Sequence, residues 1–484
     1  MAVKKSLIFI FFTCFVIISC KKEKLFTDSS AKLDFSTDTV QFDTVFTTIG
    51  SATLNFKIYN PYNQPIKISS IRLAKGNASF FRLNINGVST RQLNDVELDA
   101  KDSMYIFVEV HIDPLNSNNP LVVQDSIVFE TNGNMQDIKL VAFGQDVNLI
   151  NGKIIQSDTT WTNTKPFLVY NSMLVDSGVT LNILAGTKIY FHKDSRLYVL
   201  GTLIANGNKD EPVLFRNDRL EHWYDDVPGQ WAGIYFATAK SNNDIVYGSK
   251  DNKLNYCEIK NAIIGVQADT NMTQYQDNPT VTISNTKILN MNAVGIYGQG
   301  AYIQAYNNVI ANCGQFAVAL TTGGKYQFYH CTIYNTWQYA NRQTPSVLLN
   351  NYYQDVNGVY QVRPLNEATF INCIIYGNLE NEVGFDAIYA ETFNYKFTNS
   401  LLKIADTTDI LNIHYENVFT NHTPGLKNPD NDDFSLDTLS FCIDKGDNSI
   451  NQYPFNIDIL ENFRDNKPDL GAYERQNLKW ENLY

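Results

Sequence analysis

The segment Ile283-Ser284-Asn285-Thr286-Lys287-Ile288-Leu289-Asn290 is one of six copies of a single pattern in the second half of the chain. Each copy centres on a small residue. An apolar residue stands three places before it, Asn or His usually stands one place before it, and Ile or Leu stands two places after it. The small residues are Cys257, Thr286, Asn308, Cys331, Cys373 and Ser400. Because equivalent residues of successive repeats stack in a solenoid, each position predicts one line of contacting side chains.

The spacing of the copies indicates a right-handed parallel β-helix. Successive small residues lie 29, 22, 23, 42 and 27 residues apart, which fits either a β-helix or leucine-rich repeats. The copies lack a Leu frame and helical periodicity, and are rich in β-branched, aromatic and Asn residues. We expect rungs about 4.8 Å apart, with Ile and Phe inside and Asn amides hydrogen-bonding at the bends. The longest step predicts an insertion of about one extra rung at 336–366.

The start of the chain predicts export and a lipid anchor. Lys4 and Lys5 precede a short apolar run at 7–18, as in a signal peptide at 1–19. The following residues, Val16-Ile17-Ile18-Ser19-Cys20, resemble a bacterial lipobox. That resemblance implies cleavage before Cys20, acylation of its thiol and a polar tether at 20–29, while an ordinary signal peptide with an incidental Cys is the alternative. Several acyl chains on one residue would hold the protein on a membrane, and we expect the outer membrane of a cell envelope.

Residues 30–148 predict a β-sandwich. Short runs rich in β-branched and aromatic residues are separated by turn-forming Pro, Asn and Gly, as in sandwich domains. The predicted strands are Thr39–Thr47, Ser51–Tyr59, Ile66–Leu73, Met104–His111, Ser126–Glu130 and Ile138–Gly144. The segments 52–60, 113–114 and 140–144 resemble immunoglobulin-like domains of the spindle-protein/hydin type, which implies a spacer or docking module.

Residues 149–476 predict the β-helix, followed by a tail at 477–484. The alternating segments Leu181–Phe191, Leu197–Gly207 and Trp231–Phe236 resemble the opening rungs of β-helix lipoproteins from Bacteroidetes-type bacteria. Near the end, Pro468-Asp469-Leu470-Gly471-Ala472-Tyr473-Glu474 resembles the terminal segment of choice-of-anchor Q proteins. Cys442 and Lys445 depart from that pattern, where small residues are usual. The resemblance implies a surface or envelope protein and names no reaction.

The net charge and the positions of the cysteines restrict the partners and cofactors that can be expected. The net charge of −12 and the absence of a basic patch argue against nucleic acid as a partner. Cys331 and Cys373 fall in one interior column, where stacked buried thiols are favoured over a disulfide. No Cys or His spacing typical of a metal site occurs, so no cofactor is predicted.

Three segments carry candidate ligand-binding residues. The loop 218–228 contains His222, Trp223, Tyr224, Asp225 and Asp226; it predicts a glycan or Ca²⁺ site, or a solvated loop packed by its own aromatics. The insertion contains Trp337, Tyr339, Arg342, Tyr352, Tyr353 and Arg363. Aromatic faces beside Arg suit sugar rings and carboxylates, and a lid over an apolar surface is the alternative. The acidic run 428–433 is either a Ca²⁺ site or a polar turn.

No catalytic motif accompanies these segments. The signatures of polygalacturonase-like and pectate-lyase-like enzymes are absent, as are a Ser-His-Asp order and a nucleophile elbow. His330 stands in the Asn column and is expected to replace Asn as a hydrogen-bonding residue. The sequence therefore predicts a non-catalytic envelope lipoprotein that presents its β-helix to a glycan or another surface protein. The alternatives are a polysaccharide lyase or glycoside hydrolase acting on acidic glycans, and a structural or adhesive surface element.

Overall fold

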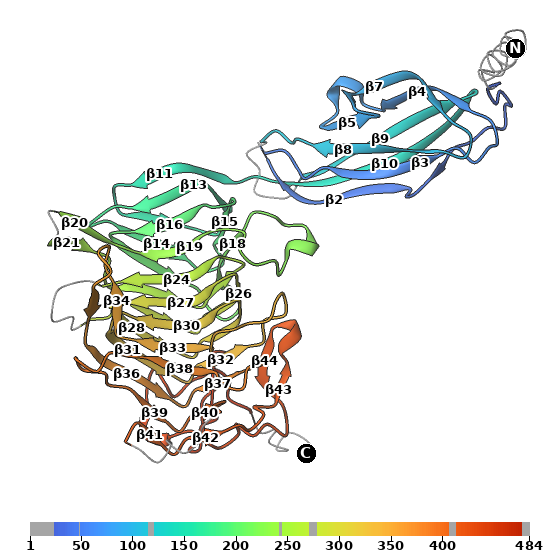
Figure 1. The fold of residues 1–484 in the computed structure, drawn as a ribbon. Helices are drawn as coiled ribbons and strands as arrows, with labels where there is room; N and C mark the ends of the chain where they lie inside the picture. Colours follow the sequence, from blue (N-terminus) through green and yellow to red (C-terminus); the bar gives the residue numbers. More distant parts are fainter. Residues whose placement is uncertain are drawn as a thin grey trace, which may run out of the picture. The chain divides into compact units, whose positions relative to one another are not determined.

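The computed structural model is all-β (Figure 1) and describes residues 24–47, 49–114, 121–241, 244–270, 278–405 and 413–476. Cys20, the predicted signal peptide and the 477–484 tail lie outside the described residues. The chain divides into two compact units, 1–146 and 147–484. The only helical segments in the described part are short 3-10 turns at Gly76–Ala78, His222–Tyr224, Pro429–Asn431 and Asn448–Ile450. No helix within these residues is long and apolar enough to span a membrane.

The first unit is a sandwich of two five-stranded sheets, confirming the predicted fold. One sheet has the order β1 (Asp34–Phe35), β3 (Leu54–Tyr59), β8 (Ser103–Val110), β5 (Phe81–Ile85) and β6 (Val88–Thr90). The other has the order β2 (Thr39–Phe46), β10 (Asn134–Gln145), β9 (Leu121–Thr131), β4 (Ile66–Leu73) and β7 (Gln92–Leu98). Inward side chains such as Phe56, Phe81 and Phe129 form one core between the sheets.

The second unit is a parallel β-helix whose coils supply strands to three stacks, here named columns I, II and III. Two strands at the start, β11 (Asn148–Ile155) and β13 (Phe167–Val175), span columns I and II. Column I then contains β15 (Lys188–Phe191), β18 (Val213–Asn217), β23 (Cys257–Lys260), β26 (Lys287–Met291), β29 (Val309–Cys313), β32 (Thr332–Asn335), β37 (Ile374–Gly377), β40 (Leu401–Leu402) and β42 (Phe419–Thr420).

Columns II and III complete each coil. Column II contains β16 (Arg196–Val199), β19 (Gly233–Phe236), β24 (Ile264–Asp269), β27 (Val294–Gln299), β30 (Phe316–Thr321), β33 (Val347–Asn350) and β38 (Val383–Asp386). Column III contains β12 (Thr159–Trp161), β14 (Thr180–Leu184), β17 (Thr202–Asn206), β22 (Asn252–Asn255), β25 (Val281–Ser284), β28 (Tyr302–Tyr306), β31 (Gly324–Tyr329), β36 (Leu365–Ile371), β39 (Lys396–Thr398) and β41 (Tyr415–Glu416).

The predicted repeat register is confirmed. Ile288 pairs with Ile259 on one side and Ile310 on the other, and the line continues through fully buried Ile333 to Ile375. In column III the predicted Phe line forms a ring stack, with centroids of neighbouring rings 4.9 Å apart. Like residues therefore fill the interior at the same height in successive coils.

Asn occupies the bends because they need a left-handed backbone. Asn285 and Asn307 have φ of 50° and 53°, a region that Asn tolerates better than most residues because its short side chain hydrogen-bonds locally. The amide Nδ2 of Asn307 donates to Oδ1 of Asn285 at 3.1 Å. The buried His330 continues the ladder, as predicted, since the Asn372 amide lies 3.0 Å from its Nε2.

The segment 336–366 differs from the expected extra rung. Its strand β33 pairs with β30 and β38 as an ordinary member of column II. The additional length lies in a loop before β33 and in the hairpin of β34 (Tyr352–Gln354) and β35 (Tyr360–Val362) after it. Long loops at two corners lengthen one coil without adding another, which spacing alone cannot distinguish from an extra rung.

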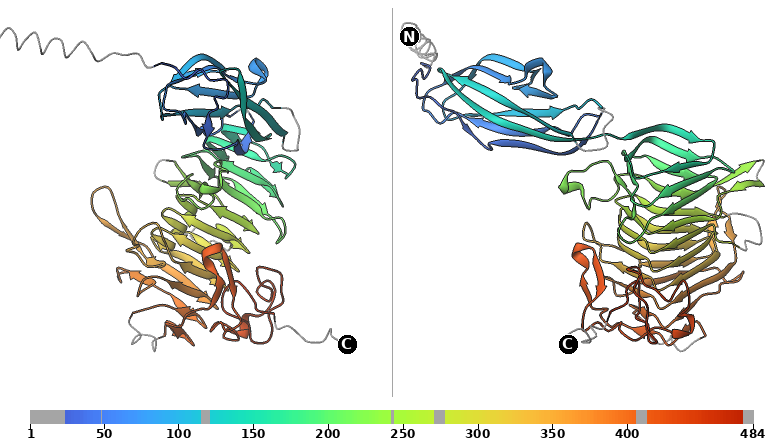
Figure 2. Two further views of the ribbon diagram at one scale, coloured as in Figure 1. Left: turned by 90° about the vertical axis from the view of Figure 1, so that its right-hand side faces the viewer. Right: turned by 180° about the vertical axis from the view of Figure 1, so that it is seen from behind.

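The C-terminal segment, residues 426–474, lies against the outer side of column I. It begins with β43 (Leu426–Asn428) and β44 (Asp433–Leu436), which lie beside β32 and β37 in Figure 1 and form the red-orange hairpin in Figure 2. Its apolar side chains cover outward residues of column I that are fully or almost fully buried, including Leu289, Val309 and Ile374. It also bonds to the Asn ladder, since Arg464 donates to Oδ1 of Asn307 at 3.0 Å.

The cysteines of the described residues are free and buried. Cys331 and Cys373 directly precede the paired residues Thr332 and Ile374, so they lie on adjacent coils. Burial raises the pKa of the Cys373 thiol well above its ordinary value. The structure therefore has the stacked thiols that the repeat pattern favours.

Candidate glycan-binding face

The first predicted segment forms a long loop at the corner between columns I and II. It follows β18, and the buried Asn261 side chain holds it by donating to the carbonyl of Asp225 at 2.9 Å. Asp225 pairs with Arg216 at 3.1 Å, and Asp226 pairs with Lys260 at 2.9 Å. His222 packs edge-on against Trp223, which is half exposed, while Tyr224 packs under the Arg219 guanidinium.

Side chains from the other two predicted segments also lie at this corner. The exposed Tyr339 donates from its hydroxyl to the carbonyl of Asp226 at 2.8 Å, and its ring packs against buried Trp337. Within the acidic run, Asp432 pairs with Lys260 at 3.1 Å. Burial lowers the pKa of Lys260, but the carboxylates of Asp432 and Asp226 outweigh that effect and leave the pKa raised.

Arg342 does not meet the role predicted for it. Its side chain is fully buried and pairs with the equally buried Glu382 at 2.5 Å. The guanidinium also donates to the carbonyl of Asn335 at 3.0 Å, and the carboxylate accepts from the Ser346 hydroxyl at 2.6 Å. The two charges pair with each other in the protein interior, so the Arg342 side chain is not exposed to a ligand.

The remaining predicted residues lie at the opposite corner, between columns II and III. Tyr352 donates from its hydroxyl to Asp386 at 2.7 Å. Arg363 lies 5.7 Å from the ring centre of Tyr353, which is 42% exposed. The structure thus separates the residues predicted in 336–366 into two groups on either side of column II.

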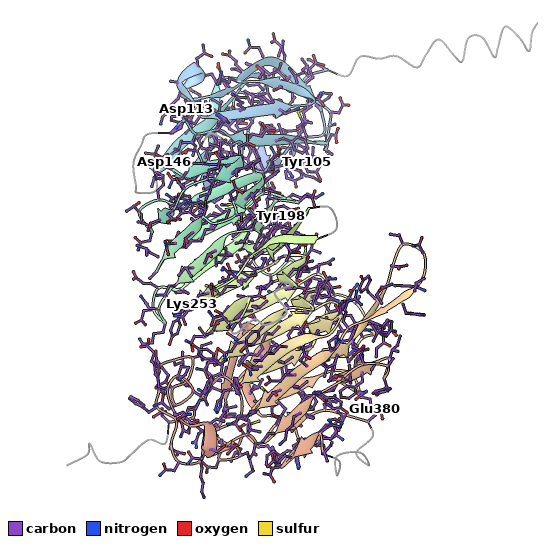
Figure 3. All side chains as sticks on the ribbon, turned by 90° about the vertical axis from the view of Figure 1, so that its left-hand side faces the viewer. Tyr105, Asp113, Asp146, Tyr198, Lys253 and Glu380 are labelled. Atoms are coloured by element: carbon purple, nitrogen blue, oxygen red, sulfur yellow. The ribbon has the colours of Figure 1, made fainter. Side chains whose placement is uncertain are left out.

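Between these corners, column II presents an outward polar and aromatic surface, here named the front face: Arg196, Tyr198, Tyr235, Gln267, Asp269 and Tyr297. Register places Tyr198, Tyr235, Gln267 and Tyr297 in one line along four successive coils. Figure 1 shows these strands between the hairpin of β20 (Thr238–Ser241) and β21 (Asp244–Gly248) on one side and the loop after β18 on the other. Figure 3 labels Tyr198 in the early coils.

Contacts within the front face hold its side chains in place. The Arg196 guanidinium carbon lies 5.8 and 5.6 Å from the ring centres of Tyr198 and Tyr235. Tyr235 donates from its hydroxyl to Asp269, and burial followed by that contact raises the pKa of Tyr235 well above its ordinary value. The Gln267 amide donates to Gln299 on the next coil at 3.1 Å. These contacts fix Arg196, Tyr198, Tyr235 and Gln267 in place.

The front face was not among the predicted sites. Its residues occupy the outward positions of column II strands, which alternate with inward apolar positions. They do not form a short motif that could be recognised along the sequence. The signal that could have found them is the register itself, which stacks Tyr198 on Tyr235 once the coils are aligned. Within the described residues, no group of three or more His, Cys, Asp or Glu side chains is placed to hold a metal ion.

The comparison with protein families agrees with the β-helix. Residues 245–402 match the family model described as "Right handed beta helix region". No curated protein matches the chain. Among solved structures, the catalytic domain of GH87 alpha-1,3-glucanase in complex with nigerose covers 76% of this chain and 88% of its own, at 10% identity and a TM-score of 0.19. The ASH / PapD-like domain of human CEP192 covers 27% of this chain and 97% of its own, at 8% identity and a TM-score of 0.18. The chain is a sandwich followed by a right-handed parallel β-helix.

Proposed function

We propose that the protein is a lipid-anchored envelope protein whose front face binds an extended glycan. The observation that carries this proposal is the line of Tyr198, Tyr235, Gln267 and Tyr297 on successive coils. Coils lie about 4.8 Å apart, a step comparable with one sugar of an extended chain. A linear glycan along the axis would therefore meet an equivalent surface at each coil.

The chemistry of the face suits sugars. Tyrosine rings offer flat apolar surfaces to the C–H faces of a sugar, and their hydroxyls can hydrogen-bond. The Gln267 amide both donates and accepts, and the Asp269 carboxylate accepts. Few side chains would need ordering on binding, because Arg196, Tyr235 and Gln267 already form contacts with neighbours. A surface-protein partner remains the second prediction, and the face lacks the large apolar centre of a stable protein interface.

The test is a glycan-array screen of the full chain in detergent, repeated with a Tyr198→Ala/Tyr235→Ala double variant. Each aromatic contact is worth roughly 1 kcal/mol, so we expect retained glycans to bind on the order of tenfold more weakly or worse. Tyr105→Ala is the matched control, because Tyr105 is a tyrosine 48% exposed on the sandwich. Affinity that is unchanged in the double variant, or a failure to retain any glycan, would contradict the proposal; the latter would favour a structural or protein-binding role.

A further inference from the structure

Three titratable side chains that the proposed function does not use meet at the first coils of the corner between columns I and II. Nδ1 of His192 lies 2.7 Å from Oδ2 of Asp218, whose side chain is 10% exposed, while the imidazole itself is 44% exposed. The imidazole stacks on the Tyr170 ring at 4.0 Å with an interplanar angle of 7°. Each of these residues directly follows a column I pairing, in the line Val169, Phe191, Asn217, so three successive coils build the cluster.

This geometry is that of an oriented base. A carboxylate at Nδ1 fixes the ring and its tautomer and leaves Nε2 to act on a substrate. Burial first, and then the nearby Asp218, raise the pKa of Tyr170 to about 12, so its ring packs against the imidazole as a neutral phenol. The half-exposed ring is thus held at Nδ1 by a buried carboxylate and on one face by an aromatic ring.

The cluster borders the front face. His192 opens a four-residue turn, closed by the Ser195 N–H donating to its carbonyl at 3.0 Å, and Arg196 follows as the first front-face residue. Among the residues that the structure describes, the Arg196 guanidinium donates to one carbonyl, that of Ala232, at 3.3 Å, which leaves further N–H donors for a ligand. A planar guanidinium with free donors is suited to a carboxylate. Arg196 therefore favours an anionic ligand at this end of the front face, and among glycans that chemistry points to uronate sugars.

We propose that His192, oriented by Asp218, is the general base of a β-elimination on a uronate-containing glycan bound along the front face. Nε2 takes the proton from the carbon next to the carboxylate, while Arg196 stabilises the negative charge that develops on that carboxylate. The electron pair of the broken C–H bond forms a C=C bond, and the adjacent C–O glycosidic bond breaks. The imidazolium returns its proton to the leaving oxygen, so no water is consumed and one unsaturated sugar end and one new free end result.

This inference rests on the proposed function, because the front face has to hold the chain that His192 acts on. It assigns a base to the lyase that the sequence leaves open as an alternative to binding. The test is incubation of the full chain with polygalacturonate and with alginate, following the ultraviolet absorbance of the unsaturated product and, separately, binding of each polymer. Unsaturated product is expected from one of them. Binding without product would overturn the elimination and leave the binding proposal intact, whereas no binding and no product would overturn both.

Two variants of His192 test whether its imidazole is the general base. His192→Ala should lower the rate on the order of 100-fold or more with polymer binding retained, as expected for loss of a general base. His192→Gln keeps a polar side chain and should be equally slow. His422→Ala is the control, since it also removes a ring-stacked imidazole, that on Phe441, and should leave the rate unchanged. A rate that survives both His192 variants would overturn the assignment.

Asp218 acts through His192, so its test needs a readout that packing alone would not change. Asp218→Asn should slow the reaction with polymer binding retained, because it removes the carboxylate that fixes the ring, and Asp218→Glu, which keeps a carboxylate, should recover part of the rate. A rate that Asp218→Glu does not recover would show that Asp218 only packs the corner and would contradict its assigned part.

Discussion

At the scale of single residues, the repeat contains two kinds of position, each restricted for a different physical reason. Positions that point inward, such as Ile288, Ile310 and Ile333, repeat the same shape because each side chain packs on its equivalents above and below. Positions at bends, such as Asn285 and Asn307, repeat because only a few residue types readily adopt the left-handed backbone conformation found there. Outward positions such as Tyr235 and Gln267 obey neither constraint, so they are free to carry a binding surface.

Ile333→Asp tests the apolar packing at an inward position. Ile333 is fully buried, so the variant would place an unpaired carboxylate among stacked apolar side chains, at a cost of roughly 5 kcal/mol or more. We expect cooperative unfolding of the β-helix at a much lower temperature, measured by circular dichroism. Lys253→Asp, at a partly exposed outward position of β22 labelled in Figure 3, is the control and should change stability by less than about 0.5 kcal/mol. An unchanged melting curve for Ile333→Asp would refute the register.

The same separation explains how much the sequence could predict. The β-helix and its strand register followed from inward and bend positions because these recur at fixed spacing. The front face could not be found in this way, because Tyr198, Tyr235 and Tyr297 become neighbours only when the coils stack. Arg342 was misread as a ligand residue, since a loop Arg near aromatics gives no sign of its buried partner Glu382, forty residues later.

At the scale of elements, the C-terminal segment acts as a cover for column I. Outward residues of that column become apolar towards the end of the solenoid, and the segment buries them with Phe434, Leu436 and Leu470. Its polar residues fix its position on the Asn ladder, as where the Asp447 N–H donates to Oδ1 of Asn372 at 2.6 Å. No local periodicity revealed its docking surface, because the two partners lie far apart in sequence.

The docking of this segment should weaken as pH rises. Burial first, and then Asp469, raise the pKa of Glu474 from 4.5 to about 7. Between these values the folded chain binds a proton that the unfolded chain has released, so the contribution of Glu474 to stability is complete below pH 4.5 and is lost as pH rises through about 7. Comparing melting temperatures below pH 4.5 and above pH 7, we expect a smaller difference for Glu474→Gln than for the unchanged chain. Glu380→Gln, at an exposed position, is the control; an identical difference in Glu474→Gln would contradict the prediction.

At the scale of the whole molecule, the two units divide the work that the proposed function requires. The sandwich has its own closed core, so it can serve as a spacer without support from the β-helix. The β-helix supplies a rigid line of equivalent positions, and the loops at two of its corners border the front face. A glycan-binding protein built in this way gains from a fixed attachment point, because tethering keeps the front face at the cell boundary where polymeric sugars are encountered.

Cys20→Ala tests that attachment. If the thiol of Cys20 carries diacylglycerol, its acyl chains contribute about 0.8 kcal/mol for each CH₂ buried in the bilayer, far more than the polar residues Lys21-Lys22-Glu23-Lys24 could supply. The variant should therefore move from the membrane pellet to the soluble fraction, while its β-helix keeps its melting temperature. Cys14→Ala is the matched control, because Cys14 belongs to the predicted signal peptide and should leave the protein in the pellet. Continued sedimentation of Cys20→Ala with membranes would mean that the protein is held there by something other than a lipid on Cys20, and the function would then need a partner at the membrane.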